Sequence, residues 1–416
     1  MNHSAIEVAA AIIFAIALLH TFTAKLFERL AHRHPRHAGL MHLLGEVEIV
    51  FGFWAAVLIV VMALMVGGSE AVGYAESRHY TEPLFVFVVM VVAASRPVLE
   101  SVRRVVAAVA AWLPIPTRLA QVWLSLSLVP LLGSLITEPA AMTLAALMLL
   151  RTLFLTDLPE RLKYAALGVL FVNISIGGTL SSFAAPPVLM VAATWQWDSM
   201  FMLTHFGWRA AIAVVINATV MCWFMRRPLA EPLQEEGAAA PVPLLVSLIH
   251  YAFLAGVVVF AHHPVIFMGL FLFFLGYAQA YNTHQSPLIL KEGLLVGFFL
   301  AGLVVLGGMQ QWWLQPIISG LSPLALFFGA TALTAITDNA ALTYLGSLIT
   351  GISDEAKYML VAGAVTGGGL TVIANAPNPA GVALLKNGFR DGSIGAGGLL
   401  MGALPPTLVA LALFLI

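Results

Sequence analysis

Long apolar segments recur along the whole chain, and they restrict its fold more than any other feature. A helix that crosses a membrane needs about 20 mostly apolar residues. Segments of this kind are expected near residues 5–25, 42–66, 83–102, 164–194, 200–224, 244–262, 264–283, 293–311, 358–386 and 394–415. The sequence therefore predicts an all-α polytopic membrane protein.

The proportion of charged residues supports the same fold class. Only 9% of the 416 residues are charged and 61% are hydrophobic, whereas a soluble globular domain carries about 25% charged residues. The net charge of −1 gives no indication of a nucleic-acid partner. The single cysteine, Cys222, excludes an intramolecular disulfide framework and a multi-cysteine metal site.

The basic residues predict the orientation of the spans in the cell (inner) membrane, because cytoplasmic loops carry an excess of Lys and Arg. Two further apolar regions, 119–155 and 321–352, contain polar, Gly and Pro residues. We expect both to be re-entrant hairpins, the first entering from the cytoplasm and the second from outside. All 19 Lys and Arg residues then lie inside except Arg78, Lys357 and Arg209. This topology puts the N-terminus outside.

One motif occurs twice. The stretch 135–149, LITEPAAMTLAALML, is similar to 335–349, AITDNAALTYLGSLI. The alignment pairs Thr137 with Thr337, Glu138 with Asp338, Pro139 with Asn339, and Thr143 with Thr343. Each copy places an acid in an apolar run, where an unpaired charge is expensive and usually functional.

A second motif follows each copy of the first, so the two recur in the same order. The stretch 173–190, NISIGGTLSSFAAPPVLM, is similar to 365–382, VTGGGLTVIANAPNPAGV, and Gly177-Gly178 pairs with Gly367-Gly368. Five predicted spans separate the two acids, and an odd number makes the repeats inverted. Inverted repeats with broken helices are typical of secondary transporters. Alternatively, the glycines permit close packing and the prolines only kink the helices.

The repeats predict the domain organisation. Residues 1–118 would be N-terminal membrane helices that form a scaffold, and 119–225 would be the core of the first repeat. The polar segment 226–243 would be a cytoplasmic linker, and 244–416 would be the second repeat. Each repeat would contain one re-entrant hairpin and one broken transmembrane helix.

These motifs resemble those of a known superfamily. GGTLSSFAAPP and GGGLTVIANAPNP are similar to the helix-break motifs of the ion transporter superfamily, which includes dicarboxylate–sodium symporters, arsenite and citrate carriers, and sodium/proton antiporters. GEVEIVFGFWAA (45–56) and the residues before it resemble a bacterial family of sodium/proton antiporters. The resemblance covers most of the chain and implies a homodimer.

The two acids indicate whether the substrate is a cation or an anion. The dicarboxylate symporters carry neutral Ser-Asn-Thr at each hairpin tip, whereas this chain has Glu138-Pro139 and Asp338-Asn339. Two buried carboxylates would repel a dicarboxylate and attract Na⁺. A carboxyl group that can hold either a proton or a cation permits their exchange. The sequence therefore predicts Na⁺/H⁺ exchange; the alternative is a Na⁺- or H⁺-coupled symporter of a small organic or inorganic anion.

The candidate ion site is centred on Asp338, the expected main exchange carboxylate, with Na⁺ at Asp338 and Asn339 and with Glu138 as the pseudo-symmetric partner. Side-chain oxygens are expected from Thr137, Thr143, Thr337 and Thr343. The broken helices would contribute Asn173, Gly177, Gly178, Thr179, Gly367, Gly368, Thr371, Asn375 and Asn378. In the alternative interpretation each acid caps a half-helix, and Glu138 is solvated at the cytoplasmic mouth of its hairpin.

Other residues have weaker indications. Glu48 is a candidate for a proton path, although solvation at the interface would also explain its position.

No cofactor is expected beyond the transported ions. An intramembrane enzyme would need a nucleophile–base pair or metal ligands, and no such pattern is found, so enzymatic activity is not expected. The repeat does not distinguish a transporter from a channel.

Overall fold

The computed structural model describes residues 5–33, 38–229 and 241–416. Within these ranges every regular element is a helix, which confirms the all-α fold class. The greater part of the expected linker 226–243 lies outside the described residues.

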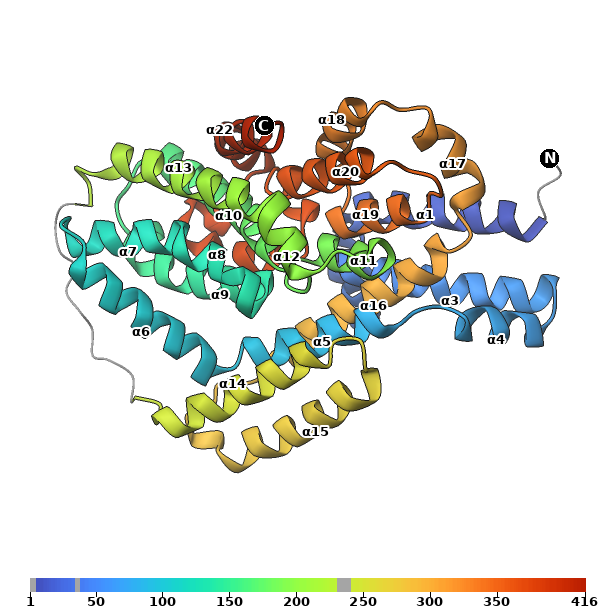
Figure 1. Ribbon diagram of the computed structural model, residues 1–416, viewed down its shortest axis with the longest axis horizontal. Coiled ribbons are helices and arrows are strands. Elements are labelled where there is room, and N and C mark those ends of the chain that lie inside the picture. The colour runs from blue at the N-terminus through green and yellow to red at the C-terminus, as the bar shows by residue number, and fades with distance from the viewer. Residues whose placement is uncertain (1–4, 34–37, 230–240) are drawn as a thin grey trace.

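The N-terminal part of the chain contains six helices, in the blue shades of Figure 1. They are α1 (Ala5–Arg33), α2 (Ala38–Gly45), α3 (Val47–Met65), α4 (Gly68–Glu76), α5 (Thr81–Ala93) and α6 (Arg96–Trp112). The next part contains α7 (Thr117–Leu126), α8 (Leu128–Ile136), α9 (Glu138–Leu149), η2 (Leu150–Phe154), α10 (Glu160–Gly177), η3 (Gly178–Leu180), α11 (Pro186–Trp195), α12 (Ser199–Met202), η4 (Leu203–Gly207) and α13 (Trp208–Met225).

The remainder of the chain follows the expected linker. Its elements are α14 (Leu244–Val259), α15 (Pro264–Ala280), η5 (Asn282–His284), α16 (Leu290–Gly307), α17 (Gln311–Ser319), α18 (Pro323–Thr334), α19 (Asn339–Ser347), α20 (Asp354–Gly367), η6 (Val372–Ala374), α21 (Asn378–Leu385), η7 (Lys386–Gly388), η8 (Arg390–Gly392) and α22 (Ala396–Phe414).

Several helical stretches are long and apolar enough to cross a membrane. In the described residues there are five: Glu48–Met65, Glu160–Leu180, Ser199–Met225, Leu290–Gly307 and Ala396–Phe414. The number rises to seven if the bent pairs α5–α6 and α7–α8 are each one span. The chain is therefore a multi-pass membrane protein.

One expected span is not a single straight helix. Residues 83–102 are divided between α5 and α6, which are bent by 62°. Ser95 between them is extended (φ −64°, ψ 145°), and Pro97 lies in the first turn of α6. Proline has no N–H to continue a helix, so it favours a helix start at this position.

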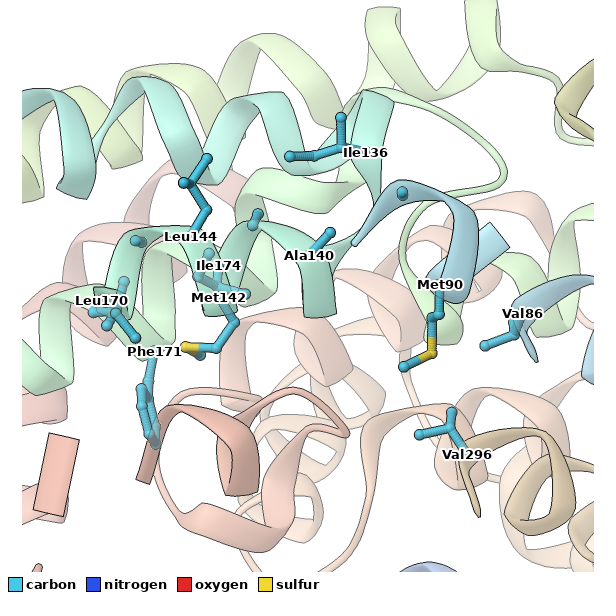
Figure 2. Packing of buried hydrophobic residues seen from close by; sticks show 14 of the residues in the cluster. Val86, Met90, Ile136, Ala140, Met142, Leu144, Leu170, Phe171, Ile174 and Val296 are labelled. Atoms are coloured by element: carbon cyan, nitrogen blue, oxygen red, sulfur yellow. The ribbon is translucent and has the colours of Figure 1, made fainter. Parts of the chain in front are cut away.

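Helices from distant parts of the chain pack together in the interior. Near the centre of Figure 1, α11 lies beside α19, and the two are in contact. Similarly, α21 packs against α9. Figure 2 shows Met142 of α9 close to Phe171 of α10, and both side chains lie against Gly381 of α21. These contacts bring the acid motif of each half against the Gly-Gly motif of the other half.

Candidate ion-binding site

The helical backbone is interrupted at both copies of the Gly-Gly motif. After α10 ends at Gly177, the chain forms the turn η3, becomes extended at Ser181 and is helical again from Pro186. After α20 ends at Gly367, it becomes extended at Thr371, and α21 begins at Asn378. We call these segments, 178–185 and 368–377, the first and second interruptions. Their backbone groups need partners other than the helix itself.

Ser134 of α8 supplies partners for the first interruption. Its Oγ donates to the carbonyl of Gly177 at 2.7 Å and accepts from the amide of Leu180 at 2.9 Å. The hydroxyl of Ser181 donates to the Ser134 carbonyl at 2.6 Å. No motif singled out Ser134, although it aligns with Thr334 in the register that pairs Glu138 with Asp338.

The second interruption is held by the side-chain amide of Asn378, the first residue of α21, and by the C-cap residue of α18. Asn378 Nδ2 donates to the carbonyls of Gly368 at 2.8 Å and Thr371 at 2.9 Å. The Thr371 hydroxyl donates to the carbonyl of Ala335 at 2.8 Å. Asn378 and Thr371 therefore stabilise the non-helical backbone of this segment through hydrogen bonds.

Glu138 is the first residue of α9, and its side chain has no exposed surface. Its Oε2 accepts a hydrogen bond of 2.8 Å from Asn375 Nδ2 in the second interruption. Its Oε1 has no partner. The alternative in which Glu138 is solvated at the mouth of a hairpin is therefore wrong, because the carboxyl group is completely enclosed.

Thr137, immediately before α9, has a strained backbone. Its φ is +75°, a region that costs a β-branched residue about 1–3 kcal/mol. The Thr137 hydroxyl is buried without a partner, while the Glu138 amide donates to the carbonyl of Ala184 at 3.4 Å. The turn that positions Glu138 is thus held against the first interruption despite its strain.

Asp338 has a different environment from Glu138. It is the N-cap of α19, and its Oδ1 accepts from the amides of Ala340 at 2.8 Å and Ala341 at 3.1 Å. The side chain is partly exposed. Asp338 therefore does cap its half-helix, as the alternative interpretation proposed. Capping does not prevent a second role, because its Oδ2 is not used by these bonds.

The three candidate acids are near enough to interact through their charges. Glu48 lies near enough to Asp338, and Asp338 near enough to Glu138, for each pair to repel when both members are ionised. Beside Glu48, Glu46 forms a 2.9 Å ion pair with Lys291 of α16. The structure thus brings Glu138, Asp338 and Glu48 into one region, although they lie on three different helices.

Asn339 lies beside the second interruption. It has no exposed surface, and neither its Oδ1 nor its Nδ2 has a partner. A Cβ on Gly368 would stand 2.9 Å from Asn339 Nδ2 and 2.1 Å from the hydroxyl of Ser175 in α10. Ser175, which was not among the predicted site residues, therefore also lies beside Gly368.

The other selected residues have local or packing contacts. The hydroxyls of Thr143, Thr179, Thr337 and Thr343 donate to backbone carbonyls three or four residues earlier. Asn173 lies within α10, away from the interruption, where it bonds the carbonyls of Leu126 and Val214 and accepts from Asn217. Gly177 and Gly367 pack against backbone carbonyls of α8 and α18.

A cavity of about 600 Å³ reaches the first interruption, where Ser182 and Phe183 line it. Its other polar lining includes Glu82, Asp198 and His262. The cavity is large enough to hold water and lies beside the first interruption, which contacts Glu138. Glu138 itself does not line the cavity.

A buried carboxylate between interrupted helices, in a multi-pass α-helical membrane protein, is typical of membrane transport proteins. The family model described as "Putative Na+/H+ antiporter" matches residues 5–416, and the chain belongs to this family. None of the curated proteins matches the chain. Family membership supports cation/proton antiport as the general activity.

Proposed function

We propose that the protein exchanges Na⁺ for H⁺ through Glu138 and Asp338. The observation that carries this proposal is the enclosed carboxyl group of Glu138. No cationic side chain of the described residues pairs with it, and one of its oxygens has no partner. An isolated buried carboxylate costs several kcal/mol, so it must bind a proton or a cation. Competition between the two for one group is the chemical basis of exchange.

The same proposal includes an inverted repeat, with α8–α9 and α18–α19 as re-entrant hairpins and α10–α11 and α20–α21 as broken helices. Four contacts support it. α8 packs against α10, and α18 packs against α20. α9 of the first half packs against α21 of the second, and α11 packs against α19. Corresponding elements thus have corresponding partners, which is the pattern of inverted-repeat transporters.

Asp338 is proposed as the second exchange carboxylate, with Asn339 beside it. Its cap bonds use Oδ1, so Oδ2 is free to take a proton or Na⁺. Glu48 would pass protons between Asp338 and the surface near the Glu46–Lys291 pair. The expected orientation, with the N-terminus outside and the linker in the cytoplasm, and the homodimer with 1–118 as scaffold belong to this proposal.

The alternative, symport of an anion, has less support from the site. Neither Glu138 nor Asp338 has an ion-pair partner in the described part of the chain. An anion would therefore meet two carboxylates with no cation between them, and the repulsion would oppose its binding.

Exchange can be measured in proteoliposomes that contain a pH-sensitive dye. An inward Na⁺ gradient, with gluconate as the counter-ion, is expected to drive proton efflux in the wild type. Choline gluconate should produce no flux. Glu138→Gln keeps the shape of the side chain but cannot ionise, and it should abolish the flux. Full exchange by Glu138→Gln would contradict the proposal, and proton flux that follows a permeant anion instead of Na⁺ would favour symport.

A further inference from the structure

Unpaired polar atoms are concentrated at the contact between α9 and the second interruption. Besides Glu138 Oε1, the buried oxygens without partners include Asn375 Oδ1, Asn378 Oδ1 and Asn339 Oδ1. The three amides are at most 1% exposed. A buried unsatisfied polar group costs about 1–3 kcal/mol, so four of them in one region need an explanation.

These side chains form one connected group. Asn375 bonds directly to Glu138, and the backbone amide of Asn378 donates to the Asn375 carbonyl at 3.0 Å. Asn378 also bonds the carbonyl of Gly368, which lies against Asn339. The group therefore joins the first copy of the acid motif to the second copy of the Gly-Gly motif.

We propose that this group is a binding site for a dehydrated monovalent cation, with Glu138 and Asn375 as its principal ligands and Asn378 and Asn339 as further oxygen donors. The inference rests on the proposed function, because Na⁺ is the cation that exchange would deliver to it. A bound Na⁺ satisfies the free oxygens of Glu138 and Asn375 together, and it neutralises the single carboxylate.

The composition of the site favours a monovalent over a divalent cation. One carboxylate supplies one negative charge, and amide oxygens add none. Among the described residues there is no group of three His, Cys, Asp or Glu side chains that could hold a metal ion. Carboxylate and carbonyl oxygens suit hard cations, and the single negative charge of this donor set is neutralised by a monovalent one.

The site differs from the one expected from the sequence. The expected site had Asp338 as its main carboxylate and Glu138 as the pseudo-symmetric partner, whereas this one is centred on Glu138 and bridges the two halves. Asp338 is not a member of the connected group, since its side-chain hydrogen bonds go to the backbone of α19. Na⁺ at the bridging site would therefore tie α9 to the second interruption, and its release would loosen that contact.

Na⁺ binding can be measured separately from transport by thermal unfolding of the purified full chain in detergent. NaCl replaces choline chloride at constant ionic strength, and the dependence of Tm on Na⁺ gives an apparent Kd. The wild type should be stabilised by Na⁺. Glu138→Gln should lose the stabilisation, and Asn375→Leu should raise the Kd at least about tenfold. Asn375→Asp keeps an oxygen at the site and should still bind Na⁺.

Gln310→Met is a matched control, because Gln310 is a fully buried amide whose two ends are both paired with Leu306 and Trp313. It should leave the Na⁺ affinity unchanged. If Asn375→Leu does not fold, a double-mutant cycle of the milder Glu138→Asp and Asn375→Ser replaces it. Side chains that share one ion should then show coupled effects on the Kd.

Unchanged Na⁺ affinity in Asn375→Leu, or strictly additive effects in the cycle, would overturn the bridging site. Such results would not affect the proposed exchange, provided that wild-type proteoliposomes still show Na⁺-driven proton flux. Conversely, Na⁺ binding that depends on Asn375 without any proton flux would support the site and contradict the function.

Discussion

Gly178 of the first interruption lies directly against the carboxyl group of Glu138. A Cβ atom on Gly178 would stand 2.5 Å from Glu138 Oε1 and 2.6 Å from Cγ. The absence of a side chain at Gly178 is therefore what leaves room for the free carboxylate oxygen. The first interruption and the second, which contributes Asn375, enclose the same acid from two directions.

Gly178→Ala should impair exchange by displacing the Glu138 carboxyl group. Overpacking of this kind costs about 1–3 kcal/mol, so the Tm should fall, and the Na⁺ concentration for half-maximal proton flux should rise. Gly276→Ala in α15 is the control, because a Cβ there meets nothing within 4 Å. Wild-type flux by Gly178→Ala would show that Glu138 does not need this position.

Substitutions of Asp338 separate its cap from its proposed role in exchange. Asp338→Asn keeps a good N-cap, whereas Asp338→Ala should lower the free energy of unfolding by about 1 kcal/mol. Both should lose Na⁺-driven proton flux if the carboxylate exchanges ions, and both should still show Na⁺-dependent stabilisation from the bridging site. Full flux in Asp338→Asn would reduce Asp338 to a cap alone.

Ser134→Ala should destabilise the first interruption. It removes the hydroxyl that hydrogen-bonds the Gly177 carbonyl and the Leu180 amide. Leaving these buried groups unpaired should lower the free energy of unfolding by about 1–3 kcal/mol. Ser127→Ala is the comparison, because its hydroxyl only donates to the carbonyl of Trp123 one turn earlier. Chemical denaturation of both variants gives the difference, and equal stabilities would contradict the role assigned to Ser134.

Gly402 of α22 allows close packing against α10, and its substitution should weaken this contact. A Cβ on Gly402 would stand 2.2 Å from the carbonyl oxygen of Tyr164, and backbone atoms cannot move away easily. Gly402→Ala should lower the Tm, whereas Gly397→Ala, where a Cβ meets nothing within 4 Å, should not. A Tm equal to that of the wild type in Gly402→Ala would mean that the two helices can separate at little cost.

Much of the architecture could be predicted locally. Apolar segments of spanning length predicted the helices, and Pro97 and Pro186 lie in the first turns of α6 and α11. The Gly-Gly motifs coincide with real interruptions of α10 and α20. The bend between α5 and α6 was missed, because composition alone does not show that Ser95 becomes extended.

The sequence predicted many of the residues of the candidate site, but it did not predict how they are arranged. Asp338 was predicted to be the main carboxylate and Glu138 its pseudo-symmetric partner, yet Glu138 is the enclosed acid and Asp338 caps α19. Ser134 and Ser175 were not selected at all, because a serine in an apolar helix has many ordinary roles. Asn173 was selected from the motif, but it joins α10 to α7 and α13 instead.

By itself the sequence determined that this chain is a helical membrane protein with two copies of an acid motif and of a glycine motif, since hydrophobicity and helix-breaking residues act locally. Only the tertiary structure decided that the two motifs meet across the halves. The partner of Glu138 is Asn375, 237 positions away. A hydrogen bond over that separation depends on how α9 and α21 pack, and no local pattern specifies such packing.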